Sequence, residues 1–247
     1  MFPGIYGDKA ELVEFQARLS VSVSIEIIEL QSLEEPRAEL SDMEAIGLAA
    51  AHEIERRSPQ WPLMLAGYSF GGSVAFEAAR HLISSGRSVC FLGIIDVLNP
   101  RPETHYNQRS SWGRFFRLVG KIYAGGYGGF SSLCYRLLRE LLGRSCSSDF
   151  RLRHLLTILS AVWPSRARFF RRMLLFHFRR QAVERWRPTP IQAPVFLAFS
   201  QENSSAIDQW NSLCPQACVI RLPGTHIKIF QPPSLEILLS EFGKAVL

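Results

Sequence analysis

The residue most suggestive of chemistry is Ser69, at the centre of Gly67-Tyr68-Ser69-Phe70-Gly71. The segment fits Gly-x-Ser-x-Gly, a pattern that presents a nucleophilic serine on a strained turn between a strand and a helix. The apolar run WPLMLAGYS before it is typical of a strand buried on both faces, and SVAFEAARHLISSG after it predicts a helix. Side chains in place of the two glycines would collide with the neighbouring strand or helix. We therefore predict that Ser69 is a nucleophile.

A nucleophilic serine needs a general base, and the best candidate is His226 in LPGTH, just after the last predicted strand. The loop that carries it leaves the sheet at the same carboxyl edge as Ser69, where ligands and catalytic groups gather in open α/β sheets. We interpret the other histidines as surface or partly packed residues; they are His52, His81, His105, His154 and His177.

The base in turn needs an acid that orients it, and two aspartates are candidates. Asp96 directly ends the apolar strand VCFLGIID, where a carboxylate has no packing role and is costly to bury without a partner. Asp208 lies in the polar run SQENSSAIDQW, which we expect to be a loop in which an acid needs no explanation. Both loops can reach a histidine, and we favour Asp96.

Two backbone amides should stabilise the oxyanion that forms when the serine attacks. The Phe70 amide lies where the predicted helix begins and is the first candidate donor. The second should come from the glycine-containing loop FPGIYG near the start of the chain. There we favour the amide of Ile5, with Tyr6 as the alternative.

Strands alternate with helices along the chain, which predicts a mostly parallel sheet with helices on both faces. We expect one domain over residues 1–247, interrupted by a helical insertion at about 101–188. The predicted strands cover residues 21–30, 61–69, 89–96, 193–200 and 217–224, and the predicted helices cover 9–19, about 43–57, 73–86 and 234–247.

Charge is unevenly distributed along the chain. Residues 101–188 contain 18 Lys and Arg against 4 Asp and Glu, whereas the rest of the chain is acidic on balance. The basic side chains are the solvated faces of amphipathic helices, or they attract an acidic partner or a membrane surface. Nucleic-acid binding is disfavoured because no known binding module is visible.

The chain shows no signal peptide and no apolar run long enough for a membrane span, so we expect a cytoplasmic protein. Cys214 and Cys218 form a Cys-x3-Cys pair, but no second pair completes a zinc set, so we expect no metal. We interpret all five cysteines as free buried thiols; the other three are Cys90, Cys134 and Cys146.

These motifs resemble the thioesterase domains that terminate nonribosomal peptide synthetases and polyketide synthases. The resemblance rests on FPGIYGD, WPLMLAGYSFGGSVAFEAARHL, GIIDVLNP and LPGTH. It implies an α/β-hydrolase fold in which the 101–188 insertion is the lid over the acyl pocket. In this family the acid follows the strand after the serine turn, which matches Asp96.

The resemblance also implies a reaction and a partner. An acyl or peptidyl chain would pass from the phosphopantetheine thiol of a carrier protein to Ser69, and hydrolysis or internal cyclisation would then release it. No cofactor of its own is implied, since the carrier protein presents the substrate. The alternatives are a lidded carboxylesterase or lipase, and an inactive relic that only binds a carrier protein.

The start of the chain departs from the family. Only Met1 and Phe2 precede Pro3, although a central strand should lead into this loop. A missing central strand would leave rows of unpaired backbone groups in the sheet. We therefore expect a truncated N-terminal strand, in a chain that is a C-terminal piece of a longer synthetase or whose true start lies upstream.

Overall fold

The computed structural model describes residues 1–5, 9–19, 24–29, 42–60, 62–97 and 167–246. The chain divides into two compact units, Met1–Arg101 with Leu175–Leu247, and Pro102–Leu174. The first unit contains the sheet and every candidate site residue named above. Apart from the helix α7 (Ala167–Arg185), the predicted lid at 101–188 lies largely outside the described residues.

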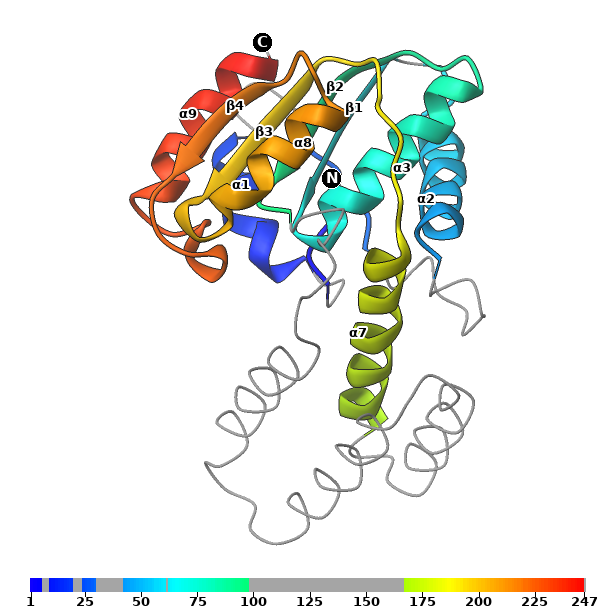
Figure 1. The fold of residues 1–247 in the computed structure, drawn as a ribbon, viewed down its shortest axis with the longest axis horizontal. Helices are drawn as coiled ribbons and strands as arrows, with labels where there is room; N and C mark the ends of the chain where they lie inside the picture. Colours follow the sequence, from blue (N-terminus) through cyan, green and yellow to red (C-terminus); the bar gives the residue numbers. More distant parts are fainter. Residues whose placement is uncertain (6–8, 20–23, 30–41, 61, 98–166, 247) are drawn as a thin grey trace, which may run out of the picture. The chain divides into compact units, whose positions relative to one another are not determined.

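Within the described residues, the sheet has four parallel strands in the order β1 (Leu63–Tyr68), β2 (Val89–Ile95), β3 (Val195–Ser200) and β4 (Cys218–Leu222) (Figure 1). All four match predicted strands. Neighbouring strands pair in register near their carboxyl ends, which are therefore brought to one edge of the sheet, as the position of the candidate site requires.

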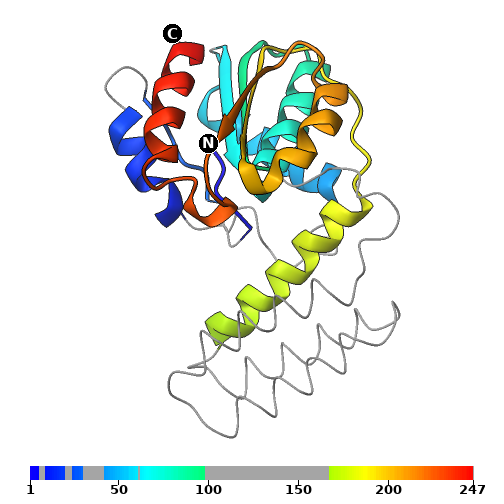
Figure 2. The ribbon, with the colours of Figure 1, turned by 60° about the vertical axis from the view of Figure 1, so that its left-hand side comes forward.

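Helices cover both faces of the sheet, as predicted for parallel strands. On one face lie α2 (Met43–Arg57), α3 (Phe70–Ser84) and α8 (Ile207–Leu213) (Figure 2). On the other lie α1 (Val13–Leu19) and α9 (Ser234–Val246), with a short 3-10 turn leading into α1. Helix α3 begins at Phe70, so the turn at Ser69 passes directly from strand β1 into a helix.

Each face of the sheet has its own aromatic core. On the α3 side, Phe76 lies 5.4 Å from Trp210 and 5.8 Å from Trp186 between ring centroids, both in edge-on contacts. On the α9 side, Phe15 and Phe242 pack edge to face at 5.3 Å. Buried aromatic pairs of this kind add to the hydrophobic stabilisation of both layers, and so hold the strand ends in place.

Met1 and Phe2 lie where the central strand was expected. The Phe2 amide donates to the Ala66 carbonyl at 2.9 Å, and the Tyr68 amide donates to the Phe2 carbonyl at 3.1 Å. On the other side, the Ile28 amide donates to the Met1 carbonyl at 2.9 Å. Met1 and Phe2 thus lie between the segment 24–29 and β1 and bond to both. Phe2 forms a single parallel bridge with Gly67 of β1.

The strand predicted over 21–30 is wrong for its described part, residues 24–29, which have no regular secondary structure. Alternating Val and Ile favour a strand only where a neighbour supplies a ladder of hydrogen bonds. Here the adjacent segment consists of Met1 and Phe2, so the pairing is too short to form one.

The polar run after β3 is helical, which corrects the prediction of a loop. It forms a 3-10 helix, η5 (Gln201–Ala206), followed by α8. Asp208 therefore lies in the first turn of a helix, where a carboxylate interacts favourably with the helix dipole. Helices of six and seven residues show too little apolar periodicity to be recognised in a sequence.

Two of the cysteines differ from the prediction of buried thiols. Cys214 is buried, but Cys90 and Cys218 are exposed free thiols, each in a strand position that faces away from the core. Cys134 and Cys146 lie outside the described residues. None of the helices in the described ranges is long and apolar enough to cross a membrane.

Candidate active site

Ser69 has a strained backbone between β1 and α3. Its φ of 55° and ψ of −127° lie in a region that residues other than glycine rarely adopt. Such a conformation costs on the order of 1–3 kcal/mol and persists only where the surroundings impose it. The Ser69 amide donates to the Ile95 carbonyl at 2.8 Å, which ties the turn to the end of β2. The prediction of a strained turn at this serine is confirmed.

The two glycines of the motif allow close backbone packing, as predicted. A Cβ at Gly67 would lie 2.0 Å from the Gly71 carbonyl oxygen. A Cβ at Gly71 would lie 2.2 Å from the carbonyl oxygen of Pro3. Both separations are far below van der Waals contact, so only glycine lets the first turn of α3 approach β1 and the loop after Phe2.

Asp96 follows β2 and is fully buried. Like Ser69 it has a positive φ, 51°, and its amide donates to the Ala198 carbonyl at 2.7 Å. One carboxylate oxygen, Oδ1, accepts from the Ser200 amide at 2.7 Å. The other, Oδ2, lies 2.8 Å from Nδ1 of His226. Both oxygens of the buried carboxylate thus have partners.

His226 begins the 3-10 turn η6 (His226–Lys228) after β4. Its ring lies between Ser69 and Asp96 and contacts both. Its Nδ1 faces Asp96, and its Nε2 lies 3.0 Å from Oγ of Ser69. A carboxylate at Nδ1 favours the tautomer with the proton there, which leaves Nε2 free to accept the serine proton. The structure therefore joins Ser69, His226 and Asp96 by hydrogen bonds, in the geometry of a nucleophile, a base and an orienting acid.

Three further residues contact His226 and were missed in the sequence. The Tyr68 hydroxyl donates to the His226 carbonyl at 2.9 Å, and the two rings stack with their centroids 5.0 Å apart. Glu202 accepts from the His226 amide at 3.0 Å, and the Asn203 amide nitrogen lies 3.4 Å from Nδ1. In the sequence, the position of Tyr68 next to Ser69 was the one indication that it belongs to the site. Nothing in the sequence indicated Glu202 or Asn203.

The two predicted amide donors lie on different elements of the chain. Phe70 is the first residue of α3, and the amides of a first helical turn have no partner within the helix. Ile5 lies in the turn after Phe2, and its carbonyl accepts a hydrogen bond from the Arg179 guanidinium. The alternative donor, Tyr6, lies outside the described residues.

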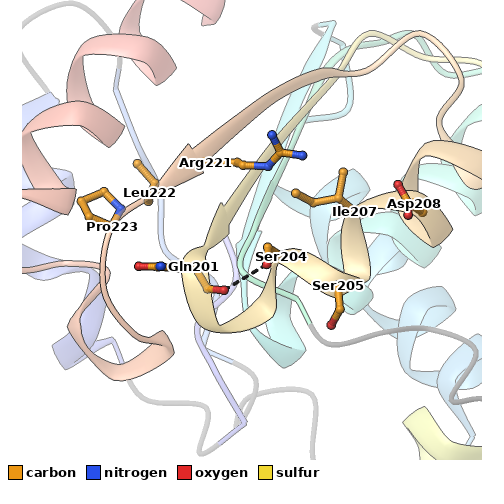
Figure 3. A pocket seen from close by; sticks show the side chains of 8 residues that line it. All are labelled: Gln201, Ser204, Ser205, Ile207, Asp208, Arg221, Leu222 and Pro223. Atoms are coloured by element: carbon orange, nitrogen blue, oxygen red, sulfur yellow. Dashed lines mark hydrogen bonds between the residues drawn. The ribbon is translucent and has the colours of Figure 1, made fainter.

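Asp208 is exposed and lines a pocket at the carboxyl ends of β3 and β4, whereas Asp96 contacts the imidazole. Figure 3 shows it on α8, at the rim of this pocket. The pocket has a volume of about 560 Å³ and is lined by Gln201, Ser204, Ser205, Ile207, Asp208, Arg221, Leu222 and Pro223.

Comparison with known proteins relates this chain to thioesterase domains. Residues 1–120 match the thioesterase domain family. The inactive atromentin synthetase invA4 of Paxillus involutus is 44% identical over 62 residues, which cover 25% of this chain and 6% of that protein. The orsellinic acid synthase armB of Armillaria mellea is 27% identical over 203 residues, which cover 78% of this chain and 8% of that protein. The chain therefore spans a small part of the length of these relatives.

Solved thioesterase structures share the fold. The NocB thioesterase domain, crystallised as a covalent complex with a fluorophosphonate nocardicin G analog, superposes with a TM-score of 0.63. It is 17% identical, and the match covers 99% of this chain and 92% of that one. This likeness shows that the chain has the α/β-hydrolase fold of the thioesterases, and the resemblance to thioesterase domains of peptide and polyketide synthetases is confirmed.

Proposed function

We propose that this thioesterase-like chain releases an acyl or peptidyl group from the phosphopantetheine thioester of a carrier protein, through an acyl-enzyme on Ser69. The observation that carries the proposal is the hydrogen-bonded series from Ser69 through His226 to Asp96, at 3.0 and 2.8 Å. A serine without such a base is a weak nucleophile, and this series supplies the base together with the acid that orients it.

In the first half-reaction, Ser69 Oγ attacks the thioester carbonyl and His226 Nε2 takes its proton. The amides of Phe70 and Ile5 stabilise the resulting oxyanion, and each such donor typically lowers the barrier by ~3–4 kcal/mol. Collapse of the intermediate breaks the carbon–sulfur bond. The proton on His226 then passes to the departing pantetheine thiolate, which leaves the acyl group esterified to Ser69.

In the second half-reaction, His226 activates the nucleophile that releases the acyl group. Water gives a free acid, whereas an amine or hydroxyl of the bound chain gives a ring. Throughout both steps, Asp96 accepts the hydrogen bond from the Nδ1–H of His226 and stabilises the imidazolium that forms transiently. The proposed chemistry needs no metal and no cofactor of the enzyme's own.

The proposed partner is an acyl or peptidyl carrier protein. The relatives that match this chain bear the names of synthetases and synthases and are many times longer than the matching segment. A release domain in such an assembly receives its substrate from a neighbouring carrier domain. We propose the same presentation here, with the carrier domain on the same polypeptide or on a separate one.

A fluorophosphonate probe tests the nucleophile, since a reagent of this class forms the covalent complex of the NocB domain. We expect covalent labelling that maps to Ser69, is absent in Ser69→Ala and is at least ~10³-fold slower in His226→Ala. Ser204→Ala is the matched control because its hydroxyl bonds only locally, to the Gln201 carbonyl, and it should label like the wild type. Absence of labelling in the wild type would indicate an inactive relic.

The substrate class is tested by comparing acyl-pantetheine thioesters with plain esters of the same acyl chain. We expect kcat/KM to favour the thioester. A strong preference for plain lipid esters would instead identify a lidded esterase or lipase, even if Ser69 labels normally.

A further inference from the structure

Arg179 is a buried cation that has no role in the reaction proposed above. It lies on α7, in the part of that helix that belongs to the compact unit containing the sheet. Only 3% of the residue is exposed to solvent. Burying a guanidinium is costly unless it makes well-placed polar contacts, so its contacts indicate what it does.

Two contacts of Arg179 reach the two sides of the proposed oxyanion hole. Nη1 donates a hydrogen bond to the Ile5 carbonyl, and Cζ lies 5.5 Å from the centre of the Phe70 ring. The second contact is within the range of a cation–π interaction. One buried side chain thus contacts both residues whose amides we propose as oxyanion donors.

These two donors come from elements far apart in the sequence, so something must fix their relative position. Oxyanion donors act only when they lie about 2.7–3.1 Å from the developing charge. The Phe70 amide is placed by α3. The loop of Ile5 is held on one side by the close approach of Gly71 to the Pro3 carbonyl, and on the other by the guanidinium at the Ile5 carbonyl.

We propose that Arg179 is a positioning residue that holds the Ile5 loop and the Phe70 ring so that both amides face the oxyanion. The inference rests on the proposed function of Ser69. A carbonyl bonded to a buried guanidinium restricts rotation of the backbone at Ile5, and the ring contact restrains the first residue of α3. In this assignment Arg179 acts through Ile5 and Phe70, and not on the reacting atoms.

The test compares Arg179→Met, which keeps much of the stem but removes the donors and the charge, with Arg179→Lys, which keeps the charge but not the planar fork. Arg180→Met is the matched control, because Arg180 pairs with Glu184 on the same helix at 2.7 Å. For each variant we would measure the melting temperature, kcat and KM on an acyl-pantetheine thioester, and the affinity for a trifluoromethyl ketone that forms a tetrahedral adduct.

We expect Arg179→Met to lower kcat by about 10–100-fold with little change in KM, since the loss of a whole donor costs about 10²–10³-fold. Affinity for the trifluoromethyl ketone should fall in parallel, and Arg179→Lys should recover part of both. Arg180→Met should stay within about twofold of the wild type, because its ion pair with Glu184 joins two residues of the same helix.

Two results would overturn the inference while leaving the proposed function intact: wild-type kcat in a folded Arg179→Met, or a lower kcat with unchanged affinity for the ketone. Loss of folding in both Arg179 variants would also overturn it, because Arg179 would then serve the fold and not the hole. If the wild type itself neither hydrolyses the thioester nor labels at Ser69, the proposed function has failed, and that outcome is separate from the others.

Discussion

The hydroxyl of Tyr68 donates to the main-chain carbonyl of His226 while its ring stacks on the imidazole at an interplanar angle of 23°. Tyr68 ends β1 and directly precedes Ser69, whereas His226 is 158 positions further along the chain. The strand that leads into Ser69, the proposed nucleophile, therefore also carries a side chain that contacts His226, the proposed base. This arrangement limits rotation of the imidazole away from Ser69.

The two contacts of Tyr68 can be separated by substitution. Tyr68→Phe removes the hydrogen bond and keeps the ring, and we expect it to lower the free energy of unfolding by about 1 kcal/mol, with a small loss of kcat. Tyr68→Leu also removes the stacking and should lower kcat further. Chemical denaturation and thioester hydrolysis measure the two effects. Equal kcat in both variants would show that the stacked ring does not position the base.

The two candidate acids can be distinguished by isosteric amides. Asp96→Asn removes the charge that selects the Nδ1 tautomer of His226, so kcat should fall by about 10³-fold or more. Asp208→Asn changes an exposed side chain in the first turn of α8 and should leave kcat within about twofold. Kinetics on the same thioester decide between them, and a larger loss in Asp208→Asn would refute the assignment of Asp96.

The close approach at Gly71 makes it intolerant of a methyl group. In Gly71→Ala the new Cβ would lie 2.2 Å from the Pro3 carbonyl oxygen, so α3 or the Ile5 loop must move. We expect lower thermal stability and loss of most activity. Gly243→Ala is the control, since its Cβ would meet Leu19 Cδ1 at an ordinary 3.8 Å; within α9 this change should stabilise the protein by up to about 1 kcal/mol. Unchanged activity in Gly71→Ala would contradict the steric argument.

The three described cysteines should differ in reactivity. Burial raises the pKa of the Cys214 thiol to about 12, so almost none of it is thiolate at pH 8. Cys90 and Cys218 are exposed. Iodoacetamide at pH 8 should therefore modify Cys90 and Cys218 in the folded protein and Cys214 only after denaturation, as read by peptide mass mapping. Rapid alkylation of native Cys214 would show that the C-terminal end of α8 opens readily.

The strands and long helices of the sheet unit could be predicted because their signals are local. Continuous apolar runs indicated the four strands, and helical periodicity indicated helices such as α2, α3 and α9. Prediction of secondary structure failed where a strand depends on pairing with an adjacent segment, and where a helix is very short. Residues 24–29 have the composition of a strand, but the segment beside them is two residues long, and α8 is too short to show a period.

The amino-acid sequence by itself determined the strand-to-helix turn at Ser69, because the strand, the helix and the close contact of Gly67 with Gly71 all lie within a few residues of it. It also indicated His226, through its place after the last strand. Only the tertiary structure decided which acid reaches the imidazole, and it showed Tyr68, Glu202 and the buried guanidinium of Arg179 at the site. These contacts join positions more than 20 and up to 174 residues apart, and such pairings depend on how the strand ends are brought to one edge of the sheet.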